Sequence, residues 1–595
     1  MSKDYPRRDV PVPSPSESGC WGSDVIADAI RDVGIRYLFV NPGASFRGLH
    51  DSLVNHLGNH QPQMLLVLHE EHGVAMAHGY AKVTGDLCGA IVHSNVGLMH
   101  ASMAIFNAWA DRTPVLVLGA TGPVDAAKRR PWIDWIHTAQ DQGALVRHFV
   151  KWDAQPASPK AAQEAIARAV MMSNTAPQGP TYVCFDAALQ EAPVNDRLPR
   201  LDRTRYPQPA GGRPLARDVR QVMEWVRAAR RPVVLMGRVS RKTADWEQRV
   251  RLVESWGALV LTDLKLGAAF PTSHGAHAAA PGFFLSHQAA ETLRQADLII
   301  SLDWLDLAGT LGQAFGDAAC HARVVHVSLD QYVHNGWSMD HQALPQTDLT
   351  LLCDPDTFVA SVVENPDFSQ AEKRPSSSER PYPRSQISKS DTISIAQLAA
   401  DVEAAAAELD MSLIRLPLGW SGDLCDFDHP LDYLGYDGGG GIGSGPGMAV
   451  GAALGLKDSG RLPVAIIGDG DYLMGVSALW TAANARIPLL IIVANNRSFF
   501  NDELHQERVA RDRSRPIENR WIGQRIDDPA PDLAGLARAQ GLTGFGPVSE
   551  PAELVGVLRN AVEIVRAGGS VVVDVHVTPG YSPAMSSGMT RSHDD

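Results

Sequence analysis

Val464-Ala465-Ile466-Ile467-Gly468-Asp469-Gly470 is an apolar run that ends in a turn carrying one carboxylate. A second apolar run, 488–494, ends in the pair Asn495-Asn496, and the segment 474–486 between the runs is typical of a helix. This order predicts a strand–helix–strand unit, whose right-handed crossover places the two strands side by side and parallel. We therefore expect Asp469 and Asn496 together at the carboxyl ends of the strands, where open α/β sheets bind ligands.

The two polar side chains at this edge suit a magnesium ion. One carboxylate and one amide oxygen are hard ligands, and Mg²⁺ takes few protein ligands and leaves room for substrate phosphates. Either segment alone would be read as a polar turn after a strand. The two segments together predict a diphosphate that is held through a metal.

The spacing of these residues also carries a resemblance to a family. Asn496 follows Asp469 by 27 residues, so the chain reads GDG and later NN. This pattern resembles the thiamine-diphosphate (ThDP) signature shared by pyruvate decarboxylase, acetolactate synthase and benzoylformate decarboxylase. The resemblance implies that Asp469, Asn496 and the main-chain carbonyl of Ser498 hold Mg²⁺. It also implies that Gly468 and Gly470 lie beside the diphosphate.

Size and composition limit the class of protein. The chain has 595 residues, of which 45% are apolar and 20% charged, and a formal net charge of −14. This length suggests about three or four domains, and the acidic balance argues against a nucleic-acid partner. No apolar window is long enough to span a bilayer, so no membrane partner is expected. The six cysteines show no CxxC spacing, and residues 1–20 lack the apolar region of a secretory signal, which together favour the cytoplasm.

Helical and short apolar segments alternate along most of the chain. In the first block we predict strands at 36–41, 88–94, 114–119 and 180–186, and helices at 71–83 and 99–110. Later strand candidates are 232–236, 258–262, 298–302, 324–327 and 570–577. Such alternation predicts mainly parallel sheets with helices on both faces.

Composition shifts mark the expected domain boundaries. We predict a loose arm (1–20), a pyrimidine-binding domain (21–196), a central domain (215–364), a Pro/Ser-rich linker (365–390), a diphosphate-binding domain (391–580) and a tail (581–595). Three such α/β blocks match the architecture of the ThDP decarboxylases. The resemblance covers nearly the whole chain and implies three doubly wound parallel-sheet domains in series.

A pair of glutamates opens the predicted helix at 71–83. In the ThDP family the catalytic glutamate precedes a Gly-Tyr pair by nine and ten residues, and Gly79-Tyr80 have this spacing from Glu70. The resemblance implies that the Glu70 carboxyl bonds the aminopyrimidine of the cofactor and promotes its proton-accepting tautomer. We expect Glu71 to be a first-turn acid stabilised by the helix dipole, which is also the alternative for Glu70.

Two histidines flank the glutamate pair. The zinc-protease motif HExxH needs its second histidine four residues after the first, on the same helical face. His72 follows His69 by only three residues. This spacing argues against a zinc site of that kind.

A glycine-rich turn at 438–443, GGGGIG, precedes a helix of small residues at 446–456. It contains GxGxxG and would fit a dinucleotide site, but no clear apolar strand precedes it. In benzoylformate decarboxylase a similar turn, GGLG, presents a wedge residue. The resemblance implies that Ile442 bends the cofactor and that Gly441 contacts it. Packing against the following helix is the alternative for Ile442.

The segment HSNVG at 93–97 follows the strand 88–92, and NAW at 107–109 closes the next helix. They resemble HSAAG and NAW of benzoylformate decarboxylase, which implies that His93 acts in proton transfer. A structural, hydrogen-bonded histidine is the alternative. The turn NPGAS at 41–45 resembles NPGS, in which the substrate-contacting serine aligns with Ala44 and Ser45 is adjacent. A second active-site histidine has no match near 301–310, which argues against benzoylformate as the substrate.

Beyond Asn496 the segment 497–529 carries alternating charges. A solvated helix and loop is the default interpretation. Acetolactate synthase builds substrate-binding and lid elements at this position. The resemblance therefore implies that Arg520, Trp521 and Arg525 contact a substrate carboxylate, to which a guanidinium offers a bidentate fork.

The family resemblance implies a ThDP- and Mg²⁺-dependent enzyme acting on 2-oxo acids. Loss of CO₂ leaves an enamine, which yields an aldehyde on protonation or a 2-hydroxy ketone or acetohydroxy acid on attack on a second carbonyl. We favour the acetolactate-synthase-like carboligase; a benzoylformate-decarboxylase-like enzyme that releases aldehyde is the alternative. A flavin or NAD oxidoreductase is disfavoured, because 237–240 lacks a glycine fingerprint. In this family two subunits clasp each cofactor, which implies a homodimer or homotetramer.

Overall fold

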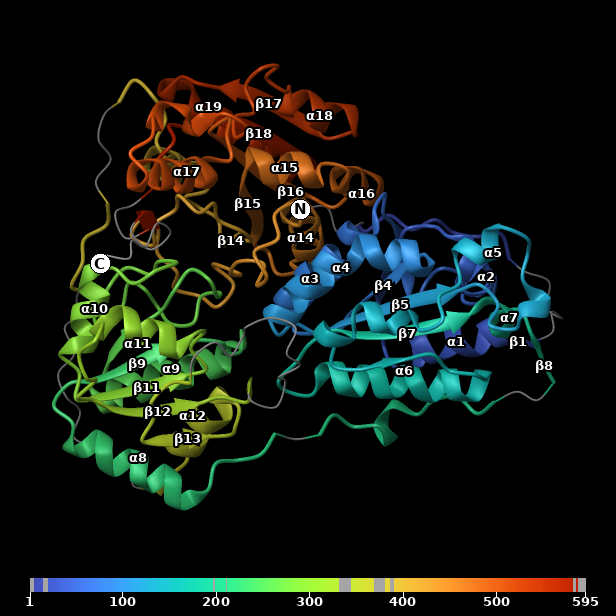
Figure 1. Cartoon of the computed structure of the whole chain (residues 1–595), viewed down its shortest axis with the longest axis horizontal. Coiled ribbons are helices and arrows are strands. Elements are labelled where there is room, and N and C mark those ends of the chain that lie inside the picture. The colour runs from blue at the N-terminus through green and yellow to red at the C-terminus, as the bar shows by residue number, and fades with distance from the viewer. Residues whose placement is uncertain are drawn as a thin grey trace.

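Three α/β units follow one another along the chain (Figure 1). The computed structural model describes residues 5–13, 20–195, 198–209, 211–330, 344–366, 368, 380–385, 390–581 and 585–586. Half of the predicted arm and most of the predicted linker and tail lie outside these residues. The described part of the arm is not loose: Tyr5 is only 6% exposed, and Gln63 Nε2 donates to the Arg7 carbonyl at 2.8 Å. Among the helices of the described part, none has the length and apolar character needed to cross a membrane.

The first unit is a six-stranded parallel sheet in the order β3-β2-β4-β5-β7-β6. Its strands are β2 (Tyr37–Val40), β3 (Gln63–Leu66), β4 (Cys88–Val92), β5 (Val115–Thr121), β6 (Asp153–Ala154) and β7 (Thr181–Asp186). Its helices are α1 (Gly22–Asp32), α2 (Arg47–Asp51), α3 (Glu70–Thr84), α4 (Ser94–Ala110), α5 (Ile133–Ile136), α6 (Pro159–Asn174) and α7 (Ala187–Gln190). A two-stranded antiparallel pair, β1 (Cys20–Trp21) with β8 (Pro193–Val194), joins the ends of the unit.

The central unit has a five-stranded parallel sheet in the order β10-β9-β11-β12-β13. The strands are β9 (Pro232–Met236), β10 (Leu259–Leu261), β11 (Leu298–Leu302), β12 (Arg323–Val327) and β13 (Leu349–Leu351). The helices are α8 (Ala216–Ala228), α9 (Thr243–Trp256), α10 (His287–Arg294), α11 (Leu307–Phe315) and α12 (Pro355–Val363). Neighbouring residues of β9 point into separate apolar cores, Val234 into one and Val233 into the other, so both faces of the sheet are covered.

The third unit has the order β14-β15-β16-β18-β17, again all parallel. The strands are β14 (Met411–Leu413), β15 (Leu462–Gly468), β16 (Leu489–Asn495), β17 (Thr543–Val548) and β18 (Ser570–His576). The helices are α13 (Ile395–Ala405), α14 (Gly445–Gly455), α15 (Asp469–Gly475), α16 (Ala478–Ala485), α17 (Phe500–Asp512), α18 (Leu533–Ala539) and α19 (Pro551–Arg566). The predicted adjacency is confirmed, because Gly468 at the end of β15 pairs with Ala494 near the end of β16.

One prediction for this unit is wrong: 474–486 is not a single helix. The structure has α15 beginning at Asp469 itself and α16 beginning at Ala478, with a break at Val476 and Ser477. The break follows Gly475, a poor helix former, whose added Cβ would lie 2.2 Å from the carbonyl oxygen of Gly443. Close contact with the glycine turn therefore ends the first helix.

The strands β3, β6, β13, β14 and β17 were also not predicted from the sequence.

A single apolar core joins the first unit to the third. In β5, Val115 and Val117 point into this core, whereas Leu116 and Leu118 point to the opposite face of the sheet. Ile491 of β16 belongs to the same core as Val115. The face of the first sheet covered by α3 and α4 therefore packs on the face of the third sheet covered by α14 and α16 (Figure 1).

Helices α3 and α14 meet at main-chain distance along this core, in a contact that we call the glycine seam. A Cβ on Gly451 would lie 1.8 Å from the Met76 carbonyl oxygen, and one on Gly79 would lie 2.2 Å from that of Met448. Since only glycine permits such an approach, the seam needs both helices to carry glycine. The helices run in the same direction, because Gly447 meets His72 and Gly455 meets Tyr80.

Candidate active site

The ends of β15 and β16 form a loop in which two side-chain oxygens converge. The Ser498 N–H donates to Asp469 Oδ2 (3.1 Å) and to Asn496 Oδ1 (3.0 Å). The neighbouring Asn495 instead donates to Asp574 Oδ1 at 2.9 Å, which ties β16 to β18. The first asparagine of the pair thus has a structural contact, while the second lies beside Asp469.

Asp469 is a buried carboxylate without a cationic partner among the described residues. Asp469 is only 4% exposed, and burial raises the pKa of its carboxyl group to about 6. Main-chain N–H groups of Gly470 and Ser498 supply its hydrogen bonds. A dication bound between Asp469 and Asn496 would compensate the buried charge, and this donor set is the kind that Mg²⁺ takes.

The glycine turn (438–443) is held from both sides by a buried arginine and two aspartates. Arg415 Nη1 lies 2.5 Å from Asp437 Oδ2, and Arg415 Nε lies 2.9 Å from Asp471 Oδ2. Asp437 accepts from the Gly440 N–H at 2.8 Å, and Asp471 accepts from the Gly443 N–H at 2.7 Å. The turn that carries Ile442 is therefore fixed in place before any ligand binds.

Glu70 is the first residue of α3, and its carboxylate is buried against α4. The residue is 6% exposed. A Cβ on Gly97 would lie 2.8 Å from Glu70 Oε1, so the glycine of HSNVG makes room for this carboxylate. His100 Nδ1 lies 3.1 Å from Glu70 Oε2. A positioned carboxyl group beside an imidazole can hold or transfer a proton.

His93 is fixed by contacts on two sides at the end of β4. Its Nδ1 lies 2.8 Å from Ser45 Oγ, and an added Cβ on Gly43 would fall 2.3 Å from its ring. The ring of His137 lies 4.7 Å from that of His93 in an edge-on arrangement. Burial, followed by repulsion from His137, lowers the pKa of His93. The lowered pKa favours the neutral ring of His93, whose second nitrogen, Nε2, is free of the serine contact.

Apolar side chains lie at the glycine turn and remain partly uncovered. Ile442 and Met474 are 37% and 56% exposed. An added Cβ on Gly441 would lie 2.5 Å from Met103 of α4, and Met99, four residues earlier in the same helix, is 57% exposed. An added Cβ on Gly443 would lie 3.1 Å from the Met474 Cβ, so Met474 adjoins the turn. The buried amide of Asn107 also lies against this turn and has no hydrogen-bond partner among the described residues. Apolar side chains with a few unsatisfied polar groups are what a ring-shaped ligand needs.

Comparison with known proteins identifies the family. The N-terminal TPP binding domain of the thiamine pyrophosphate enzymes matches residues 20–145, the central domain 219–360 and the C-terminal TPP binding domain 418–575. These matches cover most of the chain. The chain belongs to the thiamine pyrophosphate enzymes.

Curated relatives of this thiamine pyrophosphate enzyme include synthases and decarboxylases. An acetolactate synthase isozyme 3 large subunit from Escherichia coli is 24% identical over 93% of this chain and 94% of its own length. A probable 2-ketoarginine decarboxylase from Pseudomonas aeruginosa is 26% identical over 91% of this chain and 90% of its own. The solved benzoylformate decarboxylase from Polynucleobacter necessarius shares the fold, with a TM-score of 0.77, 18% identity, and 95% and 99% of the two chains covered.

The family membership explains why the two ends of the site lie on different units. Glu70 stands at the start of α3 and the glycine turn at the start of α14, and the parallel seam brings these two starts to the same end of the helix pair. Asp471 also acts electrostatically on Glu71, the residue after Glu70. Within one chain the start of α3 and the start of α14 therefore lie at the same end of the seam.

Other predicted site residues have different surroundings. Ala44 is exposed, whereas its neighbour Ser45 is buried and contacts His93. Arg520 pairs with Glu503 and Glu507 of α17, and Arg525 pairs with Glu503 at 3.6 Å. Arg525 also lies over the Trp521 ring at 5.5 Å. These contacts hold residues 520–525 against α17. A role of these residues in substrate binding stays a prediction.

The structure adds site neighbours that the sequence did not indicate. His100 and His137 reach the first-unit side from α4 and from the segment after α5. Arg415 lies two residues after β14 and Asp437 lies just before the glycine turn, and their ion pair stabilises the turn. Only Asp471 had a local signal, since it stands two residues after Asp469 in the sequence GDGD.

Proposed function

We propose that this thiamine pyrophosphate enzyme is a Mg²⁺-dependent carboligase that decarboxylates a 2-oxo acid and joins the remaining acyl unit to a second carbonyl. The observation that carries the proposal is that the chain holds a buried Glu70 carboxyl, a fixed glycine turn and a buried oxygen-lined loop at Asp469. The acetolactate synthase relatives support the carboligase among the activities of the family.

Each end of the site has a distinct task in this proposal. Bound thiamine diphosphate supplies a nucleophilic carbon and accepts the electron pair that decarboxylation releases. Asp469, Asn496 and the Ser498 carbonyl would hold Mg²⁺ against the diphosphate, with Gly468 and Gly470 alongside. Ile442 and Gly441 would support the bent cofactor from the glycine turn.

On the first-unit side the chain handles protons. Glu70 holds a proton at the pyrimidine ring, and its burial against Gly97 fixes the carboxyl for that contact. His93 exchanges a proton with the substrate through Nε2, because Ser45 Oγ engages Nδ1. The exposed apolar residues Ile442, Met99 and Met474 exclude water from the reacting carbon once ligands cover them.

A non-oxidative decarboxylase is the second candidate, and the arrangement around His93 favours it. A histidine that delivers a proton to the decarboxylated acyl unit would release an aldehyde. The probable 2-ketoarginine decarboxylase among the relatives supports the same reading.

A product test distinguishes the two functions. The holoenzyme is incubated with pyruvate, benzoylformate and 2-ketoarginine, each with and without an aldehyde or 2-oxo acid acceptor, and products are identified by mass spectrometry. We expect a coupled 2-hydroxy ketone or acetohydroxy acid whose yield depends on the acceptor. Aldehyde as the sole product with every acceptor would contradict the carboligase. A flavin absorbance band in the purified protein would point to an additional cofactor.

We also propose a homodimer or homotetramer with subunits that share the active site, as the family resemblance implies. A mixed dimer of a Glu70→Gln subunit and an Asp469→Asn subunit tests this. If each site combines two chains, one of the two sites regains both residues and activity returns. If each site lies within one chain, both sites lack one residue and the mixed dimer stays inactive.

The state of the buried cysteines supports a cytoplasmic location. In the described part of the chain Cys88, Cys184, Cys320, Cys353 and Cys425 form no disulfide, and four of these five are buried. Oxidising compartments favour disulfides. Fractionation of cells that express the tagged protein should recover it with cytoplasmic markers.

A further inference from the structure

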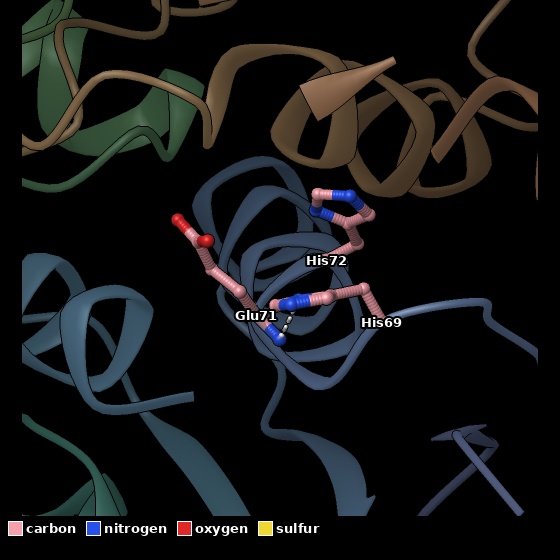
Figure 2. A group of neighbouring side chains, drawn as sticks. All are labelled: His69, Glu71 and His72. Carbon is pink, nitrogen blue, oxygen red and sulfur yellow. Dashed lines mark hydrogen bonds between the residues drawn. The ribbon is translucent and has the colours of Figure 1, made fainter. Parts of the chain in front are cut away.

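Three side chains of metal-ligand type surround the first turn of α3, outside the residues assigned to the cofactor. One ligand atom each from His69, Glu71 and His72 lies within 4.8 Å of the others. The two imidazole rings are 5.1 Å apart. Figure 2 shows the three side chains gathered around this turn.

The local backbone explains why spacing in the sequence did not reveal this group. His69 is not part of the helix: it is the N-cap, with extended backbone angles of φ −156° and ψ 141°. Its ring therefore folds back over the first turn, and its Nδ1 accepts from the Glu71 N–H at 3.2 Å. The four-residue spacing of HExxH is required only when both histidines lie within the helix. His69 precedes the helix, so the spacing rule does not apply to it.

His72 has a buried ring nitrogen that finds no partner in the described part of the chain. The residue is 3% exposed, and its Nε2 lies 2.9 Å from Ser477 Oγ at the break between α15 and α16. Its Nδ1 has no hydrogen bond to any described residue. In the tautomer in which Nε2 donates to Ser477 Oγ, Nδ1 carries the lone pair of the neutral ring. A histidine that ligates a metal usually donates its other N–H to an oxygen, as Nε2 can do here to Ser477.

Glu71 is a carboxylate that lacks a counter-charge. Among the described residues its side chain has no hydrogen bond or ion pair, although it is partly buried. Burial, and then the nearby Asp471 carboxylate, raise its pKa. A cation at this turn would neutralise Glu71 and satisfy His72 at the same time.

We propose that His69, Glu71 and His72 form a binding site for a dication of the zinc type, distinct from the Mg²⁺ site at Asp469. Two imidazoles and one carboxylate favour Zn²⁺, Co²⁺, Ni²⁺ or Cu²⁺ over Mg²⁺, which prefers oxygen ligands. Three protein ligands leave a fourth position for water. The ion competes with the Glu71 N–H for His69 Nδ1, so it acts on the turn that presents Glu70.

Cobalt binding to the holoenzyme tests the proposal. The full chain is saturated with thiamine diphosphate and excess Mg²⁺, then titrated with Co²⁺ while visible absorption and equilibrium dialysis report bound ions. We expect one saturable Co²⁺ per chain. Glu71→Gln and His72→Asn should each weaken its binding at least about tenfold, and circular dichroism of both variants checks that they are folded.

Two further variants separate this site from its neighbours. Asp469→Asn should leave Co²⁺ binding unchanged even if the proposed function fails, because it alters only the Mg²⁺ loop. His100→Asn should also leave it unchanged; loss of binding here, with Glu71→Gln unaffected, would move the ion to His69, Glu70 and His100, a second group of ligand type. Wild-type Co²⁺ binding by folded Glu71→Gln and His72→Asn, or no saturable binding at all, would overturn the proposal.

Discussion

The two ends of the proposed active site are built by opposite means. At the third-unit end, the oxygens of Asp469 and Asn496 are positioned by main-chain N–H groups at the ends of neighbouring strands. At the first-unit end, Glu70 and His93 are positioned mainly by other side chains, such as His100, Ser45 and His137. One end is fixed by the sheet itself, and the other by a group of titratable side chains.

Under the proposed function, this difference separates cofactor binding from proton transfer. A loop held by main-chain hydrogen bonds gives a constant geometry for a metal and a diphosphate, which carry charge but exchange no proton. Imidazoles and carboxyls that contact one another can share and move protons, and their pKa values respond to each neighbour. We therefore expect substitutions at the two ends to change different kinetic quantities.

The largest effect is expected at the proton-transfer end. Glu70→Gln keeps the shape of the side chain but removes its acid–base function, so kcat should fall about 1000-fold. The affinity for thiamine diphosphate, measured by tryptophan fluorescence, should change little. Glu553→Gln, an exposed first-turn glutamate of α19, is the matched control. Undiminished turnover in Glu70→Gln would remove Glu70 from the mechanism.

The next largest effect is expected at the diphosphate end. Asp469→Asn removes the charge that the dication needs, so the apparent affinities for Mg²⁺ and thiamine diphosphate should fall about 100-fold. Excess Mg²⁺ and cofactor should restore part of kcat, which would not happen in Glu70→Gln. Asp502→Asn, exposed in the first turn of α17, serves as control. A loss of kcat with normal affinity would contradict the division between the two ends.

The seam that joins the two ends should tolerate no side chain. Gly451→Ala places a Cβ against the Met76 carbonyl oxygen and should destabilise the protein by about 2 kcal/mol. Gly556→Ala in α19 has no atom within 4 Å of the added Cβ and should stabilise it by about 0.5 kcal/mol. Denaturant unfolding of both variants gives the comparison. Equal stability of the two variants would show that the helices can separate without cost.

The smallest effect concerns the histidine pair. His137→Asn removes a group that helps to lower the pKa of His93, so that pKa should rise. Because protonated His93 cannot accept a proton, the acid side of the kcat/KM profile should move to higher pH, with activity near pH 6 lowered by at most about fourfold. His321→Asn, an exposed histidine far along the chain, is the control. An unmoved profile would show that His137 does not act on His93.

The comparison of the two ends also explains what the sequence could predict. Asp469, Asn496 and the glycine turn follow apolar strands or precede a helix, so their positions depend on local pattern and on strand adjacency. The sheets and the order of the three units were predictable for the same reason. The positions of His100 and His137 beside Glu70 and His93 depend on how α4 and the segment after α5 pack. No local sequence pattern indicates this packing.

Smaller errors have the same origin in packing. The helix expected at 474–486 divides at Val476 because Gly475 meets the glycine turn, a contact from a segment 32 residues earlier in the chain. The histidine-spacing rule missed the His69 group because His69 caps α3 in an extended conformation. A tertiary contact decides where the first helix ends, and a helix cap decides where the His69 ring lies. Helix propensity and residue spacing do not report either of these.

The glycine seam fixes the register of α3 against α14. A slip of α3 along α14 by one helical turn would move Glu70 by about 5.4 Å, which is farther than a hydrogen bond reaches. Smaller slips drive main-chain atoms into one another at Gly79 and Gly451. Within one chain, the offset between the Glu70 carboxyl and the glycine turn is thus set in whole turns by main-chain contact. Substitutions that only repack side chains elsewhere in the core leave this offset unchanged.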